Sequence, residues 1–241
     1  MSAASITQSL AGKRILVTGA TGFIGTALVE RVLSALPETR LVLLIRGRGT
    51  RSAAHRAREL LDEPAFRPLR ERWGEARLVE EFLRRVEVVE GDVAVGDFRV
   101  PADLDIVVHC AADVAFDRAV DIAFATNVAG CAHLYSAVVA SGNRPHLVHV
   151  STAYVAGVRR GPILEGPSMV GVDWQTELQV VAGLRSVADV ESRQPEVLER
   201  LTREARRAPW SWRRTAAAVP PRSPRGAPWP CPRGSSRRQR G

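Results

Sequence analysis

Short apolar runs recur along the chain and are separated by longer stretches in which apolar residues follow a helical period. Five of these runs indicate strands, because their apolar positions are nearly continuous and rich in β-branched residues. Continuous runs are typical of parallel strands that are covered on both faces. The predicted strands are Arg14–Thr18, Leu41–Ile45, Val86–Glu90, Ile106–Cys110 and Leu147–Val150.

Helices are predicted between these strands, where apolar residues recur every three or four positions. The predicted helical segments are Phe23–Leu36, Ala53–Leu61, Pro68–Arg85 and Ala119–Ala140. Strands and helices in alternation indicate βαβ units, whose right-handed crossovers build a doubly wound parallel sheet. The predicted fold class is therefore α/β, with a Rossmann-type sheet.

The pattern weakens after Gly166. Trp174–Gln179 and Glu196–Arg206 keep a helical period, but no further buried strand follows, so we expect a sheet that is incomplete at its C-terminal side. Residues 207–241 hold nine Arg, seven Pro and no acidic residue. Such a segment buries too little apolar surface to order itself. We expect an incomplete dinucleotide-binding domain over residues 10–206, followed by a disordered tail.

The net charge of +8 is concentrated in that tail, because the rest of the chain holds 25 basic and 26 acidic residues. A chain with 33 Arg and a single Lys points to a GC-rich gene, and such a gene read in a shifted frame yields Arg, Pro, Ala and Gly. We interpret the tail as out-of-frame sequence and expect no nucleic-acid partner. The alternative is a nucleic-acid-binding tail, in which arginines hold phosphates and Trp210, Trp212 and Trp229 stack on bases.

The cysteines are three in number and show no CxxC or Cys/His spacing. This argues against a disulfide framework and against a zinc site, so no metal is expected. They are Cys110, Cys131 and Cys231. Residues 1–10 lack a basic segment followed by an apolar run, so we expect no signal peptide and a cytoplasmic protein.

The longest uncharged run, Ile122–Asn143, is long enough to span a bilayer. It contains polar and small residues, however, and it lies between two predicted strands. We therefore expect a buried helix of the Rossmann fold and no transmembrane segment.

A glycine-rich turn of the form GxxGxxG follows the first predicted strand and opens the first long helix. Gly19 allows the tight turn, Gly22 lets the backbone approach a pyrophosphate, and Gly25 lets the helix pack closely on the sheet. Backbone amides and the helix dipole favour phosphates at this point. A connection without a ligand is the alternative. The predicted cofactor contacts here are Thr18, Gly19, Thr21, Gly22, Phe23, Ile24 and Gly25.

The second predicted strand ends in Arg46-Gly47-Arg48, with no acidic residue. NAD enzymes place an acid there to bind the ribose 2′-hydroxyl, whereas a guanidinium suits a 2′-phosphate. We therefore predict NADPH rather than NADH, with Arg46 in contact; solvated surface arginines are the alternative. After the third strand, Asp92 is expected to accept from the adenine amino group, beside Val93, unless Asp92 only shapes a turn.

The fourth and fifth predicted strands carry the remaining candidates. Ala111 and Ala112 follow the fourth strand, where small side chains let the chain approach the cofactor, and Asn127 lies in the long helix. The fifth strand runs into Ser151-Thr152-Ala153-Tyr154-Val155. Together with the glycine turn, this order of motifs is similar to that of extended short-chain dehydrogenases/reductases.

Three details resemble the fatty acyl-CoA reductase, or male-sterility, branch of that superfamily. They are the VSTAYVAG string at residues 150–157, the GxIxE pattern of Gly161–Glu165, and the stretch from Arg46-Gly47 to the FxxLRE of residues 66–71. Thioester reductase domains of carboxylic acid reductases share much of this. The resemblance spans Leu10 to Gly166 and implies NADPH-dependent reduction of a long-chain fatty acyl-CoA thioester to an aldehyde or alcohol.

The resemblance also assigns catalytic roles. In this superfamily the tyrosine of a YxxxK motif protonates the carbonyl oxygen that accepts hydride at carbon, while a Ser or Thr hydrogen-bonds that oxygen. By position, Thr152 matches that hydroxyl and Ser151 lies beside it. YxxxK is absent, because Tyr135 and Tyr154 are the two tyrosines and Lys13 is the one lysine. We expect a C-terminally truncated member with weak turnover or none.

Two other functions stay open. A nucleotide-sugar epimerase or dehydratase of the same superfamily is disfavoured by the STAYV string and the stretch that begins at Arg46-Gly47. A non-catalytic NADP-sensing protein is compatible with the absence of YxxxK.

Overall fold

The computed structural model describes residues 5–115, 117–157, 161–166 and 171–207. Contacts divide the chain into two compact units, Met1–Trp174 and Gln175–Gly241, which are described separately. Apart from Arg207, the predicted disordered tail 207–241 lies outside the described residues. Its disorder and the domain boundary at residue 206 therefore stay predictions.

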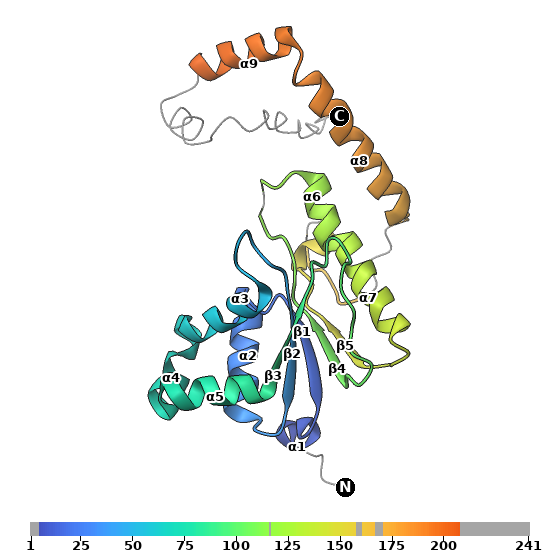
Figure 1. Ribbon diagram of the computed structural model, residues 1–241. Coiled ribbons are helices and arrows are strands. Elements are labelled where there is room, and N and C mark those ends of the chain that lie inside the picture. The colour runs from blue at the N-terminus through green and yellow to red at the C-terminus, as the bar shows by residue number, and fades with distance from the viewer. Residues whose placement is uncertain (1–4, 116, 158–160, 167–170, 208–241) are drawn as a thin grey trace. The chain divides into compact units, whose positions relative to one another are not determined.

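The first unit is built on a parallel sheet of five strands in the order β3-β2-β1-β4-β5 (Figure 1). β1 pairs with β2 in the register Leu16↔Val42 and with β4 in the register Leu16↔Val107. The crossover from β3 to β4 reverses the direction in which strands are added, as in a Rossmann fold. The predicted fold class is confirmed. The strands are β1 (Arg14–Thr18), β2 (Arg40–Ile45), β3 (Val86–Glu90), β4 (Ile106–His109) and β5 (His146–His149).

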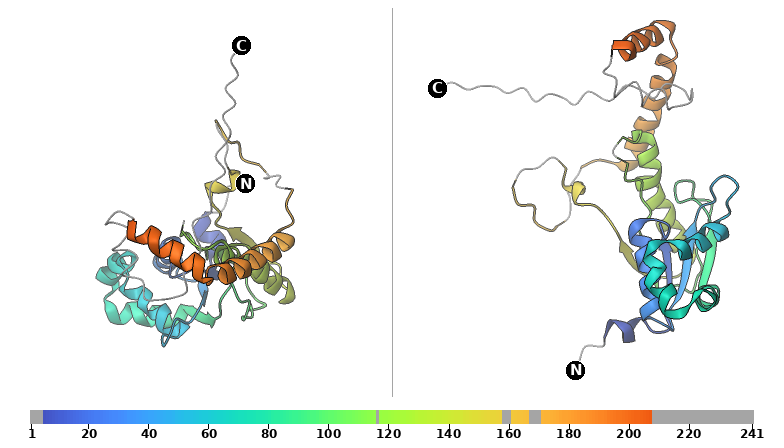
Figure 2. Two further views of the ribbon diagram at one scale, coloured as in Figure 1. Left: turned by 90° about the horizontal axis from the view of Figure 1, so that it is seen from above. Right: turned by 90° about the vertical axis from the view of Figure 1, so that its left-hand side faces the viewer.

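Helices cover both faces of the sheet (Figures 1 and 2). One face carries α2 to α5 and the other carries α7, while α6 lies beyond the carboxyl ends of the strands. In the first unit the α-helices are α1 (Ile6–Leu10), α2 (Phe23–Ala35), α3 (Ala53–Glu59), α4 (Arg67–Trp73), α5 (Glu75–Arg85), α6 (Val120–Phe124) and α7 (Gly130–Ala140). Short turns of helix are η1 (Leu60–Asp62), η2 (Pro64–Phe66), η3 (Ala125–Ala129, a π turn) and η4 (Ala153–Ala156). The second unit contains most of α8 (Trp174–Glu191) and all of α9 (Pro195–Arg207).

Two apolar cores explain the continuous apolar runs of the strands. Successive residues of a strand point to opposite faces, so Ile15 and Val17 pack toward α2 to α5, whereas Leu16 packs toward the other side. On that other side Leu16 meets Val107 and Leu134 of α7, and all three are fully buried. A strand that is covered on both faces therefore carries apolar residues at consecutive positions, instead of alternating apolar and polar residues.

The helices differ from the sequence prediction in three places. The predicted helix 68–85 is broken at Gly74, whose φ of +77° ends α4 before α5 begins. The predicted helix 119–140 contains the π turn η3 in its middle. In the second unit, α8 continues well beyond residue 179, where the predicted helix ended. Apolar side chains such as Val180 and Leu184 are exposed, so this helix lacks the single buried apolar stripe on which the prediction relied.

The segment Val120–Ala140 is a long apolar helical stretch, and only a small part of it is buried. By length and composition alone it could cross a membrane. The prediction of a buried Rossmann helix is wrong for most of this segment. Its buried residues are Ala129, Gly130 and Leu134; Leu134 packs in the core on this side of the sheet, and a Cβ at Gly130 would lie 3.3 Å from the Val93 side chain.

Arg85, the last residue of α5, is buried at 4% exposure and closes the C-terminal end of α2. Its guanidinium donates to the carbonyl oxygens of Leu33 at 2.9 Å and Val32 at 3.1 Å, to that of Leu36, and to that of Thr39 at 3.0 Å. Carbonyls at a helix C-terminus lack partners within the helix and attract cations. Burial lowers the pKa of Arg85.

We expect Arg85→Met to lower the free energy of unfolding by about 2 kcal/mol, because it leaves several buried carbonyls without a donor. Arg84→Met is the matched control, since exposed Arg84 pairs with Glu81 on the surface and its loss should leave stability nearly unchanged. Urea unfolding of both variants measures the difference. Equal losses would contradict the capping role.

Candidate dinucleotide-binding site

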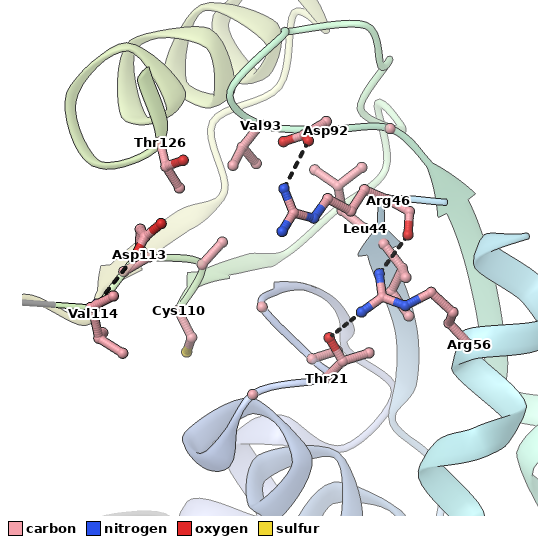
Figure 3. A pocket seen from close by; sticks show the side chains of 18 of the residues that line it. Thr21, Leu44, Arg46, Arg56, Asp92, Val93, Cys110, Asp113, Val114 and Thr126 are labelled. Atoms are coloured by element: carbon pink, nitrogen blue, oxygen red, sulfur yellow. Dashed lines mark hydrogen bonds and ion pairs between the residues drawn. The ribbon is translucent and has the colours of Figure 1, made fainter. Parts of the chain in front are cut away.

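A cavity of about 650 Å³ opens at the carboxyl ends of the strands, where the strand order reverses between β1 and β4 (Figure 3). Open α/β sheets bind ligands at this position. Most of its walls come from the segments that follow four strands and from one side chain of α3, and residues such as Ile122 and Thr126 of the long helix complete them. The segments and the α3 side chain are Gly19–Gly22 after β1, Arg46 after β2, Gly91–Val93 after β3, Cys110–Ala115 after β4, and Arg56.

The glycine turn brings the start of α2 close to the end of β4. Gly19 has a φ of +68°, and a Cβ at that position would lie 2.6 Å from the backbone nitrogen of Ala111. A Cβ at Gly25 would lie 2.2 Å from the carbonyl oxygen of Gly19. Gly22 is less crowded, since its Cβ would lie 3.3 Å from that same oxygen. The turn therefore tolerates no side chain at Gly19 or Gly25, which leaves bare backbone facing the cavity at its phosphate-binding end.

Thr21 lines the cavity with Gly19 and Gly22, but four predicted contacts of the turn do not: Thr18, Phe23, Ile24 and Gly25. The Phe23 and Ile24 side chains are 95% and 51% exposed, so what they offer a phosphate is the backbone N–H of the first turn of α2. The side chain of Thr18 is buried below the turn, where its hydroxyl accepts from the backbone N–H of Ala111 at 3.2 Å. Thr18 thus fixes the end of β4 and its direct contact with a cofactor stays a prediction.

Two arginines reach the cavity from β2 and α3 (Figure 3). Arg46 forms an ion pair with Asp92, with 3.1 Å between Nη1 and Oδ2. Arg56 donates to the Thr21 hydroxyl at 3.2 Å and to the carbonyl oxygen of Arg46 at 2.5 Å. Arg56 therefore ties the end of β2 to the glycine turn.

Positive charge accumulates around Arg56. Burial, followed by the nearby charges of Arg46, Arg48 and Arg51, lowers the pKa of Arg56. Crowded guanidinium groups are stabilised by an anion between them. The role of Arg56 was missed in the sequence, because it is a helix residue ten positions after Arg46 and only the packing of α3 brings the two together.

Asp92 serves first as a turn residue. Its Oδ1 accepts from the backbone N–H of Ala94 at 2.9 Å, and its Oδ2 accepts from Arg46. These bonds agree with the turn alternative, while the adenine contact stays a prediction. Val93 lines the cavity and is 7% exposed.

Asn127 holds the wall of the cavity formed after β4. Its Oδ1 accepts from the backbone N–H of Asp113 at 2.8 Å, and its Nδ2 donates to the carbonyl oxygen of Asp113 at 2.9 Å. Ala111 and Ala112 line that wall, and their contact with a cofactor stays a prediction. Asn127 does not line the cavity itself, whereas its neighbour Thr126 does (Figure 3).

Ser151 and Thr152 lie just past the end of β5, and both are exposed. The Thr152 hydroxyl accepts from the backbone N–H of Tyr154 at 3.2 Å, which caps the short helix η4. Neither residue lines the cavity. Their catalytic roles stay predictions.

A second group of polar side chains lies between the sheet and α7. His109 Nδ1 lies 2.7 Å from the Thr18 hydroxyl and its Nε2 lies 3.4 Å from Cys131 Sγ. The hydroxyl of Tyr135 hydrogen-bonds Nδ1 of His149. Burial, assisted by the nearby His149, lowers the pKa of His109 to about 4. Burial raises the pKa of Cys131 and of Tyr135.

The sheet order, the glycine turn and the cavity at the strand ends define a dinucleotide-binding protein of the Rossmann class. The chain belongs to the male sterility protein family, whose profile, that of an NAD-binding domain, matches residues 17–208. This confirms the resemblance found in the sequence.

Curated relatives are fatty acyl-CoA reductases, which are oxidoreductases. The chain is 34% identical over 171 residues to probable fatty acyl-CoA reductase 5 of Arabidopsis thaliana, which covers 66% of the chain and 34% of that protein. It is 33% identical over 178 residues to the alcohol-forming fatty acyl-CoA reductase of Simmondsia chinensis, covering 69% of the chain and 36% of that protein. The chain thus spans about a third of the length of these relatives.

Solved structures of similar fold include the terminal R domain from the myxalamid PKS-NRPS biosynthetic pathway. The two chains are 24% identical with a TM-score of 0.48, and the match covers 72% of this chain and 44% of that one. At this level the likeness adds no functional argument.

Proposed function

We propose that the chain provides the NADPH-binding part of a reductase that acts on long-chain fatty acyl-CoA thioesters. The observation that carries the proposal is the cavity that joins a bare glycine turn to Arg46 and Arg56. Backbone N–H groups at the start of α2 suit a pyrophosphate. The two guanidinium groups suit the 2′-phosphate that distinguishes NADPH from NADH.

NADPH supplies a hydride when it is bound, and the residues of the chain hold and orient it. The glycine turn and Asn127 shape the walls on either side of the cavity, and Thr152 is the hydroxyl proposed to hydrogen-bond the thioester oxygen. The chain contains no YxxxK motif to protonate that oxygen. General acid catalysis contributes about 10²–10⁴-fold, so we expect the 241-residue chain to bind NADPH and to turn over weakly or not at all.

A titration of the purified chain with NADPH and with NADH tests the proposed cofactor. We expect NADPH to bind at least about tenfold more tightly, which corresponds to about 1.4 kcal/mol, and to raise the melting temperature more at equal concentration. Adenosine 2′,5′-bisphosphate should compete, whereas 5′-AMP should compete poorly. Equal affinity for the two dinucleotides would contradict the assignment of the arginines to a 2′-phosphate.

A non-catalytic NADPH-binding protein is the second candidate, and the absence of YxxxK favours it. Both candidates predict NADPH binding. Oxidation of NADPH that depends on palmitoyl-CoA, followed by absorbance, separates them. Slow but thioester-dependent oxidation supports the reductase, whereas tight NADPH binding without it supports the non-catalytic protein.

A further inference from the structure

Three potential metal ligands meet at the ends of β4 and β5. His109 and His149 stand opposite each other in the register of these neighbouring parallel strands, and their rings lie 5.1 Å apart at 83°. Cys131 approaches them from the first turn of α7. One ligand atom from each of the three residues lies within 4.8 Å of the other two.

We infer that His109, Cys131 and His149 form a binding site for a divalent transition-metal ion, with Zn²⁺ as the preferred ion. Two imidazole nitrogens and one thiolate form a ligand set that suits Zn²⁺ and excludes Mg²⁺ and Ca²⁺, which prefer oxygen. None of the three residues lines the dinucleotide cavity. The inference is therefore independent of the proposed function.

Hydrogen-bonding partners orient the rings of His109 and His149. The Thr18 hydroxyl lies 2.7 Å from Nδ1 of His109, and Nε2 of His109 points toward Cys131 Sγ. In the tautomer that binds a metal, Nδ1–H donates to the Thr18 oxygen and Nε2 offers its lone pair to the ion. The hydroxyl of Tyr135 holds Nδ1 of His149 in the same way. A ligating histidine usually has its second nitrogen bonded to such an outer partner, which fixes the orientation of the ring.

Small movements bring the ligands to coordination distance. Tetrahedral bonds of about 2.0–2.3 Å place ligand atoms about 3.3–3.8 Å apart, so separations of up to 4.8 Å must close by about 1 Å. His149 is exposed on the edge strand and Cys131 is half-buried, so both can move, whereas His109 is fully buried and provides the fixed point. The thiol proton of Cys131 leaves to solvent on binding.

Access and local geometry favour an open site with three protein ligands. The exposed side of His149 gives the ion an entry path, and water completes a tetrahedral shell. The π turn η3 lies directly before α7, the helix that carries Cys131 in its first turn. π turns inside helices often occur at functional sites.

Titration of the EDTA-treated full chain with Co²⁺ tests the inference, because a thiolate ligand produces an intense charge-transfer band in the near ultraviolet. We expect one Co²⁺ per chain, with that band and the visible bands of tetrahedral cobalt, and displacement by Zn²⁺ with a Kd below about 10 μM. Cys131→Ser should abolish the charge-transfer band. His149→Gln should weaken Co²⁺ binding at least about tenfold, or about 1.4 kcal/mol.

Two matched variants act as controls. Cys110→Ser removes the neighbouring thiol after β4, and His133→Gln removes an imidazole that bonds Val93 from the same helix as Cys131. Both should keep the band and the affinity, with circular dichroism confirming the fold of every variant. A wild-type chain without the band, a band that survives Cys131→Ser, or a band that Cys110→Ser removes would each overturn the inference.

Discussion

Replacing Arg46 and Arg56 together by alanine is expected to weaken NADPH binding by about a hundredfold, or about 2.7 kcal/mol, and to change NADH binding by less than about threefold. Each hydrogen bond to a charged group contributes about 1.5–3 kcal/mol, and the lower end applies here because the Arg46 side chain is 61% exposed. NADH lacks the 2′-phosphate that these groups are proposed to hold. Fluorescence titration with both dinucleotides measures the change in preference.

Arg48→Ala is the matched control for this prediction. Arg48 lies two residues beyond Arg46 but does not line the cavity, so its removal should lower NADPH affinity by less than about threefold. Arg56 also bonds Thr21 and the carbonyl of Arg46, so the single variant Arg46→Ala separates loss of charge from disturbance of the glycine turn. Equal losses for NADPH and NADH in the double variant would mean that the arginines support the turn and do not select the cofactor.

Gly25→Ala is expected to lower the free energy of unfolding by about 4 kcal/mol or more and to abolish dinucleotide binding. The added Cβ would lie 2.2 Å from the carbonyl oxygen of Gly19 and 2.7 Å from the Cα of Ala20. Both are backbone atoms, so no side chain can rotate away. Relief requires α2 to separate from the turn, and this movement would displace the backbone that faces the cavity.

Urea unfolding and NADPH titration of a glycine series measure this effect. Gly22→Ala should cost less, since its Cβ would lie 3.3 Å from the nearest atom. Gly183→Ala in α8 is the control, because no atom lies within 4 Å and alanine favours a helix, so stability should be unchanged or higher by up to about 1 kcal/mol. A Gly25→Ala chain with wild-type stability would show that the turn tolerates a side chain.

Predictions from the sequence were most accurate where a local signal and a local structure coincide. The apolar runs became β1 to β5 with ends shifted by at most one residue. For β1, β2 and β4 the reason is that strands covered on both faces carry apolar side chains at consecutive positions, whereas all four residues of the edge strand β5 are exposed. The predictions were weaker for helices. The π turn Ala125–Ala129 and the break at Gly74 leave the apolar period almost unchanged, so the period alone could not locate them.

The site residues differ in the same way: those with a local requirement were predicted, and those that depend on distant contacts were not. Gly19 and Gly25 were recognisable from the sequence because the turn between β1 and α2 leaves no room for a side chain at either position. Asn127 was recognised as part of a motif, but its bonds to the backbone of Asp113 appeared only when the helix met the segment after β4. Asp92 was expected either to accept from adenine or to shape a turn; its bond to the backbone N–H of Ala94 fits the turn, its ion pair with Arg46 joins residues 46 positions apart, and the adenine contact stays a prediction.

The sequence by itself determined the α/β class, the five strands, the glycine turn and the family, because each depends on residues that are close together in the chain. Only the tertiary structure brought Arg56 beside Arg46 and placed His109, Cys131 and His149 within reach of one another. These groupings depend on the strand order and on how α3 and α7 pack against the sheet. These residues are ten to forty positions apart in the chain and carry no local pattern that records such contacts, so only folding decides which of them meet.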